Sequence, residues 1–122
     1  MTNEEWLKEA YDLYPGWASL IKSVNDKCEE FMPNYQILQI KEKFGGLRYY
    51  YRAPKEDYPM KTLGMEICKL TVTYAETKSL STCMYCGEPA KLRQHVSWHC
   101  VLCSDCFKKE FPNEPSDTQL HQ

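Results

Sequence analysis

The chain has 122 residues, a net charge of −2 and 43% hydrophobic residues, enough for one compact domain with a core. No apolar run is long enough for a transmembrane helix, and the acidic start Met1-Thr-Asn-Glu-Glu is unlike a basic signal peptide. The weak overall charge argues against a protein that simply coats DNA. We therefore expect a cytoplasmic protein.

Two helices are expected in the first third of the chain. Thr2 with Glu5 forms a capping-box pattern, and apolar residues follow with helical spacing up to Tyr14-Pro15-Gly16, which breaks the helix. A second helix is expected from Trp17 to Phe31, ended by Met32-Pro33-Asn34. Its predicted buried residues are Trp17, Leu20, Ile21, Val24, Cys28 and Phe31.

Residues 35–52 have the alternation of a β-hairpin, with Gly45-Gly46 as the predicted turn and Lys43 opposite Arg48. A period of two divides the hairpin into two faces. The predicted core face holds Leu38, Ile40, Phe44, Leu47, Tyr49 and Tyr51, with Glu42 as the exception. The predicted solvent face holds Gln39, Lys41, Lys43, Arg48, Tyr50 and Arg52.

A third helix is predicted from Lys61 to Lys78 after a loop over residues 53–62. Its apolar stripe would be Leu63, Ile67, Leu70 and Tyr74, although Leu70 to Tyr74 also alternates like a strand.

The predicted fold class is α+β. We expect a region of two helices, a hairpin and a third helix over residues 1–80, a metal-binding lobe over residues 81–111, and a disordered tail over residues 112–122.

Four cysteines in two pairs give the strongest chemical signal. Cys83-Met-Tyr-Cys86 and Cys103-Ser-Asp-Cys106 are sixteen residues apart, a spacing typical of a structural Zn²⁺ site. Two residues between cysteines let one turn direct both sulfurs at one ion. With a hairpin through residues 90–101 and a short helix near residues 107–111, the lobe would resemble a zinc ribbon or treble clef. The thiols indicate a reducing compartment rather than disulfides.

Other residues of the chain could take the place of one of these four metal ligands. Cys100-Val-Leu-Cys103 has the same spacing as the second pair, and His95 or His99 could replace a thiolate. We prefer Cys103 and Cys106 because they lie near a predicted helix start, where the backbone dipole favours a thiolate. Four protein ligands leave no position for a catalytic water. The deaminase signature is absent, so an enzyme, in particular a metal-dependent nuclease using His95 or His99, is the minority hypothesis.

The hairpin supplies the candidate binding face. Residues 1–34 carry a net charge of −4, whereas residues 35–62 carry +3. Lys41, Lys43, Arg48 and Arg52, with Tyr50 for stacking, could bind an anion or an acidic partner, or could simply be solvated. A nucleic-acid-binding regulator is the alternative, with a surface extended by Lys91, Arg93, Lys108 and Lys109.

Two segments also carry a family resemblance. These are Lys41-Glu-Lys-Phe-Gly-Gly-Leu-Arg-Tyr-Tyr-Tyr51 and Ala75-Glu-Thr-Lys-Ser-Leu-Ser-Thr-Cys-Met-Tyr-Cys-Gly-Glu-Pro89. Together with Trp98 through Cys106, they resemble small uncharacterised zinc-ribbon proteins of bacteriophages and prophages. The chain departs from them at Ala90 and Ser97, where they often have glycine. The resemblance implies a phage protein in the bacterial cytoplasm and brings no known reaction. We expect a non-enzymatic protein that binds a host protein or a small anionic, nucleotide-like ligand, and inhibits host defence or regulation.

Overall fold

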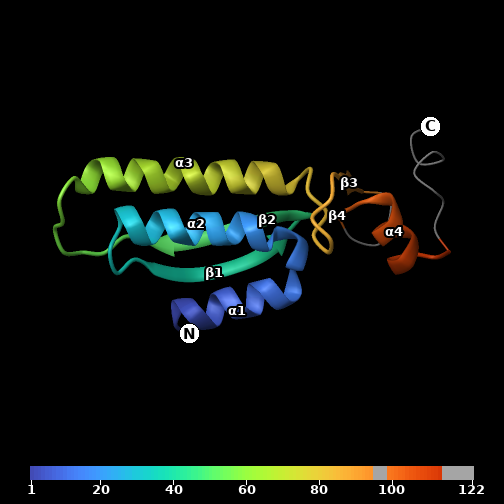
Figure 1. Cartoon of the computed structure of the whole chain (residues 1–122), viewed down its shortest axis with the longest axis horizontal. Helices are drawn as coiled ribbons and strands as arrows, with labels where there is room; N and C mark the ends of the chain where they lie inside the picture. The colour runs from blue at the N-terminus through green and yellow to red at the C-terminus, as the bar shows by residue number, and fades with distance from the viewer. Residues whose placement is uncertain (95–98, 114–122) are drawn as a thin grey trace.

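The computed structural model describes residues 1–94 and 99–113. Within these ranges, helices combine with two antiparallel strand pairs, as expected for an α+β protein (Figure 1). The elements are α1 (Asn3–Leu13), the 3₁₀ turn η1 (Pro15–Trp17), α2 (Ala18–Phe31), β1 (Gln36–Lys43), β2 (Gly46–Arg52), α3 (Lys61–Ser79), β3 (Lys91–Arg93), β4 (Cys100–Leu102) and α4 (Ser104–Glu110). Among the described helices, none is long and apolar enough to cross a membrane.

The three long helices lie along one hairpin. In Figure 1, α2 lies between α1 and α3, in front of the β1–β2 hairpin. The core between them combines residues of η1 and α2 with residues of the inner hairpin face: Trp17, Ile21, Val24, Cys28, Ile37, Ile40, Leu47 and Tyr49. The hydroxyls of Tyr35 and Tyr49 meet at 2.6 Å inside this core. The hairpin therefore has one covered face and one open face.

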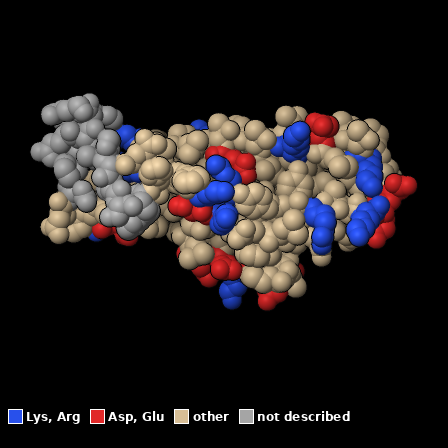
Figure 2. Space-filling model, turned by 180° about the vertical axis from the view of Figure 1, so that it is seen from behind, with Lys and Arg blue, Asp and Glu red and all other residues tan. Residues whose placement is uncertain are grey.

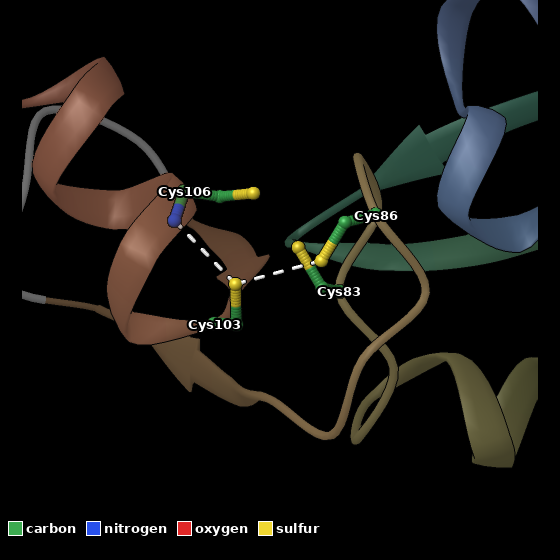
Figure 3. Close-up of side chains that lie close together, drawn as sticks. All are labelled: Cys83, Cys86, Cys103 and Cys106. Atoms are coloured by element: carbon green, nitrogen blue, oxygen red, sulfur yellow. Dashed lines mark hydrogen bonds between the residues drawn. The ribbon is translucent and has the colours of Figure 1, made fainter.

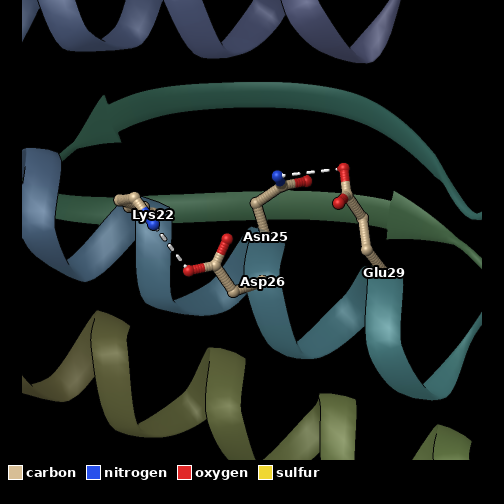
Figure 4. Close-up of polar contacts among 4 residues, drawn as sticks. All are labelled: Lys22, Asn25, Asp26 and Glu29. Carbon is tan, nitrogen blue, oxygen red and sulfur yellow. Dashed lines mark hydrogen bonds and ion pairs between the residues drawn. The ribbon is translucent and has the colours of Figure 1, made fainter.

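The two N-terminal helices agree with the sequence. Thr2 and Glu5 form the predicted capping box, with reciprocal side-chain bonds of 3.1 and 2.8 Å. On the exposed side of α2, polar side chains four residues apart contact each other (Figure 4). Lys22 and Asp26 form an ion pair of 2.8 Å, and the Asn25 side-chain amide donates to Glu29 at 3.2 Å. Asn25 also accepts a hydrogen bond from the Tyr35 hydroxyl, which links this polar side to the buried tyrosine pair.

The hairpin turn differs from the prediction by one residue. Lys43 pairs with Gly46, so Phe44 and Gly45 form the turn, with φ angles of 54° and 89°. Arg48 is therefore opposite Lys41 and not opposite Lys43. Two positive φ angles are what a two-residue hairpin turn of the favoured twist requires. The prediction was wrong because an aromatic residue rarely adopts this conformation.

The core face of the hairpin also needed correction. Leu38 and Phe44 were predicted to be buried, but they are 46% and 67% exposed. A shift in register between Ile37 and Gln39 leaves Leu38 outside the pairing and turns Ile37 inward. A β-bulge of this kind breaks the period of two, on which the prediction depended.

Helix α3 spans almost the predicted range, but a different side of it is covered. Leu63, Leu70 and Tyr74 were predicted to form its buried stripe, and they are 49%, 66% and 66% exposed. The covered side consists mainly of small residues: Gly64, Cys68, Val72, Ala75 and Ser79. Small side chains allow a close approach to α2, and a Cβ at Gly64 would collide with the carbonyl oxygen of Phe31.

The C-terminal part, which we call the cysteine lobe (residues 81–111), contains the β3–β4 pair and α4. We call the helices and hairpin over residues 1–80 the helical body. The buried residues of the cysteine lobe, among them Cys83, Val101 and Phe107, belong to the same hydrophobic cluster as those of the helical body. The domain division at residue 80 stays a prediction. Of the predicted disordered tail, residues 114–122 lie outside the described residues, as does His95.

Candidate metal centre

The first cysteine pair lies in a tight turn after α3. Cys83 N–H donates to the carbonyl oxygen of Glu88 at 2.8 Å, and Gly87 N–H donates to the carbonyl oxygen of Cys83 at 2.9 Å. These two bonds fold the chain back on itself between residues 83 and 88. The Cys83 side chain is fully buried, whereas the residue Cys86 is exposed. The turn thus presents one sulfur from inside the protein and one from its surface.

The second pair lies at the start of α4. Cys103 is the N-cap residue of this helix, and its sulfur accepts a hydrogen bond of 3.4 Å from the backbone N–H of Cys106. A serine or aspartate usually takes this capping position, because its side-chain oxygen satisfies a free N–H group. Here a cysteine sulfur does so, and the cap orients Cys103 toward the first pair (Figure 3).

All four sulfurs converge. The Sγ atoms of Cys83, Cys86, Cys103 and Cys106 lie within 4.8 Å of one another, and those of Cys86 and Cys103 are 3.5 Å apart. A disulfide would need about 2.05 Å, and all seven cysteines are free thiols. Four sulfurs at this separation can hold a metal ion between them.

The thiol acidities differ across the cluster. Burial opposes ionisation of Cys83, but hydrogen bonds from the backbone of Cys103, Cys86 and Tyr85 outweigh it and lower its pKa to about 7. Burial raises the pKa of Cys106, and the neighbouring Cys103 and Cys83 sulfurs raise it further. Several thiolates at this distance repel one another, so a cation between them would favour ionisation of the whole set.

The other metal ligands that the sequence allowed do not belong to this cluster in the described residues. Cys100 lies on β4 with its side chain buried, outside the group of converging sulfurs, and burial raises its pKa to about 11. His99 is half-buried, with its ring 6.2 Å from the ring of Phe44 at the hairpin tip. His95 lies outside the described residues.

A buried arginine supports the second cysteine pair. Arg93 is 2% exposed, its Nε and Nη2 donate to the carbonyl oxygen of Leu102 at 3.1 and 2.8 Å, and it lies 4.5 Å from the ring centre of Phe107. Sequence reasoning placed Arg93 on an extended nucleic-acid surface, together with Lys91, Lys108 and Lys109. Its burial removes it from that surface and gives it a role inside the cysteine lobe.

The helical body holds the first cysteine pair in place. Gly16 N–H donates to the carbonyl oxygen of Met84 at 2.9 Å, and Trp17 Nε1 donates to the carbonyl oxygen of Thr82 at 2.8 Å. Met84 N–H in turn bonds to Val101 at 3.0 Å. Sequence reasoning took Pro15-Gly16 only as a helix break. No local pattern in the sequence indicates this close approach.

The predicted binding face forms a second candidate site. Lys41, Lys43, Arg48, Tyr50 and Arg52 share the open face of the hairpin, because cross-strand partners point to the same side. Lys41 and Arg48 are direct partners, and Lys41 Nζ lies 5.9 Å from the ring centre of Tyr50. Arg52 donates to the Gln36 side chain. On the face seen in Figure 2, Lys and Arg side chains gather near the centre, beside Asp and Glu side chains, and again toward the end farther from the grey residues.

The cations of the open hairpin face form no ion pair with an acidic side chain of the described residues. Across residues 1–94 and 99–113, the ion pairs are Lys22–Asp26, Lys27–Glu30 and Lys61–Asp57, and none includes a cation of the open hairpin face. Two like charges directly opposite each other destabilise a hairpin. Among the described side chains, no ion pair therefore offsets the repulsion between Lys41 and Arg48.

Comparisons with protein-family models, curated proteins and solved structures found no match to this chain.

Proposed function

We propose that this chain is a zinc-stabilised, non-enzymatic binding protein in which the metal holds the cysteine lobe in shape and the open hairpin face contacts the partner. The observation that carries the zinc part is the convergence of four sulfurs within 4.8 Å. A tetrahedral Zn²⁺ site with bonds of about 2.3 Å has sulfur–sulfur edges of about 3.8 Å. The 3.5 Å between Cys86 and Cys103 is close to that value.

The donor set supports a structural role for the metal. Cys83, Cys86, Cys103 and Cys106 would fill all four positions of a tetrahedron, and a catalytic zinc keeps one position for water or substrate. Bound zinc would stabilise the thiolates and join the turn at residues 83–87 to the start of α4. Two segments with little secondary structure of their own would then be tied into the core.

Metal content tests this part directly. The protein should be purified under reducing conditions and analysed for all transition metals, with protein concentration measured independently. We expect one zinc per chain, and we expect chelation to lower the melting temperature of the folded chain. Protein that binds no metal in excess Zn²⁺, or that melts identically with and without it, would refute the structural zinc site.

The partner contact is proposed on the open hairpin face. Lys41 opposite Arg48 is an unfavourable arrangement that an anionic partner would relieve, and the neighbouring Tyr50 adds a ring that is 38% exposed. We propose an acidic patch of a host protein as the partner, or a small anionic ligand. The resemblance to phage zinc-ribbon proteins supports a phage origin, action in the bacterial cytoplasm, and inhibition of a host defence or regulatory system.

A capture experiment tests the face. Immobilised wild-type chain, the variant Lys41→Gln/Arg48→Gln and the control Lys8→Gln/Lys69→Gln would be exposed to lysate of the bacterial host. Bound proteins and small molecules would be identified by mass spectrometry. The two double variants lose equal charge, so we expect only the hairpin variant to lose a partner that the other two retain. Equal capture by all three would exclude the hairpin face.

A further inference from the structure

Helix α3 carries apolar residues on two sides, and the fold covers only one of them. Leu70 and Tyr74 are both 66% exposed, Leu63 is 49% exposed and Ile67 is half-buried. The opposite, covered side packs small residues toward α2. A row of large apolar residues left exposed on one side of a helix is typical of a surface that contacts another molecule. In Figure 1, α3 forms one edge of the molecule, so this second side lies where a partner can reach it.

The spacing of the exposed residues indicates what kind of partner fits. Leu63, Ile67, Leu70 and Tyr74 are separated by four, three and four residues, and we call this row the α3 seam. Alternating steps of three and four are typical of two helices that pack side by side at a small angle. The α3 seam contains no charged side chain, so it suits another apolar helix face.

We propose that the α3 seam packs antiparallel against the same seam of a second copy of this chain, with the two-fold axis near Leu70. A two-fold interface requires a surface that is complementary to itself. Antiparallel pairing about Leu70 places Leu63 level with the partner's Thr77, and Ile67 level with the partner's Thr73, next to its Tyr74. Each larger apolar residue therefore meets a residue of different size, and the Leu70 side chains meet each other.

Charges beside the seam favour this arrangement. Lys78 lies about 40° around the helix from Gly64, which contacts α2 at Phe31, so Lys78 flanks the seam on the α2 side. Antiparallel pairing brings it near residues 62–64 of the partner. There Glu30, Phe31 and Met60 line a hollow of about 390 Å³. Glu30 has only an exposed contact of 3.9 Å to Lys27, so the partner's Lys78 can pair with it.

The other flank of the seam brings no like charges together. Glu66 lies there, level with the partner's Tyr74 and next to its Thr73, and both of these residues are neutral. The Lys78–Glu30 contact would occur twice, once on each side of the two-fold axis. A parallel arrangement would keep Lys78 at the opposite end of the pair from the Glu30 hollow. We therefore commit to an antiparallel dimer of this chain.

Sedimentation velocity of the full, metal-loaded chain over a wide micromolar range tests the dimer. We expect a concentration-dependent dimer and at least about tenfold weaker association for Leu70→Lys, because two lysines would meet on the axis. Leu13→Lys, which changes a 51% exposed leucine at the end of α1, is the matched control and should leave association unchanged. Melting temperatures show whether each variant folds. A wild-type chain that stays monomeric, or equal association by wild type and Leu70→Lys, overturns the proposal.

A charge exchange tests the antiparallel geometry. Lys78→Glu and Glu30→Lys should each weaken the dimer, and the double variant should restore the association of the wild type. Restoration would require that these two residues face each other across the interface. A double variant weaker than either single variant overturns the antiparallel arrangement.

Discussion

The backbone N–H of Gly16 bonds to the carbonyl oxygen of Met84, so the α1–α2 junction reaches directly into the turn between the first two cysteines. A Cβ at residue 16 would overlap the carbonyl oxygen of Cys83 and lie 2.6 Å from the nitrogen of Gly87. Only a residue without a side chain fits between the helical body and this turn.

Gly16→Ala tests that close approach. The added methyl group would push the turn away from η1, and we expect a loss of about 1–3 kcal/mol in the free energy of unfolding, measured by urea denaturation. Metal affinity should fall as well, because the turn carries two of the four sulfurs. Gly46→Ala is the control, since a Cβ there meets the flexible end of Leu80 at 3.0 Å. Equal effects at the two positions would contradict the tight contact.

Cys86→Ser tests the ligand set. Serine keeps the size of the side chain but removes a soft thiolate ligand, so we expect the metal content to fall from one zinc per chain to nearly none. The melting temperature should fall with it. Cys100→Ala is the matched control, because Cys100 is buried on β4 outside the sulfur cluster. It should keep its metal. Full metal content in Cys86→Ser, or metal loss in Cys100→Ala, would contradict the assignment.

Lys41→Glu tests the hairpin register. Glutamate at residue 41 would face Arg48 and replace a repulsive pair with an attractive one, so we expect a gain of about 0.2–1 kcal/mol in the free energy of unfolding at low salt. Lys43 faces Gly46 instead, and Lys43→Glu should bring no such gain. Urea denaturation at two salt concentrations measures both variants. A gain confined to Lys43→Glu would support the register with Gly45-Gly46 as the turn.

The buried tyrosine pair makes stability depend on alkaline pH. Burial raises the pKa of both Tyr35 and Tyr49 in the folded chain, whereas unfolded tyrosines ionise near about pH 10. The stability that this pair contributes is therefore complete below that pH and is lost as the pH rises above it.

Phenolate absorbance during an alkaline titration measures this effect. At least two of the nine tyrosines should stay protonated until the chain unfolds. Tyr49→Phe should lose stability less steeply with rising pH than Tyr74→Phe, which removes a tyrosine that is 66% exposed. Ionisation of all nine tyrosines in the folded chain would contradict the buried pair.

Sequence reasoning succeeded where one local signal decided the outcome. The capping box at Thr2 and the single apolar stripe of α2 were enough to place the first two helices. The paired spacing of four cysteines was enough to identify residues that the fold brings together. In each case, residues close in sequence, or a repeated motif, carried the information.

The predictions were wrong where the sequence allowed two local arrangements and tertiary contacts determined which of them formed. Apolar residues occur on both sides of α3, so periodicity could not show that the smaller ones would face α2. Phe44 has a left-handed backbone conformation and its ring lies near that of His99, a residue far from it in the sequence. The contact of Gly16 with Met84 joins segments far apart in the sequence, and no local pattern specifies such a pair.

The Gly16 contact has a consequence for work with isolated fragments. A synthetic peptide of residues 81–111 would contain every thiol of the cluster, yet it would lack the surface against which the first turn is shaped. Such a peptide must order that turn during chelation, so it should hold zinc more weakly than the intact protein. A truncated protein that starts at Ala18 should also retain zinc less well, because it lacks Gly16 and Trp17, although it keeps every cysteine.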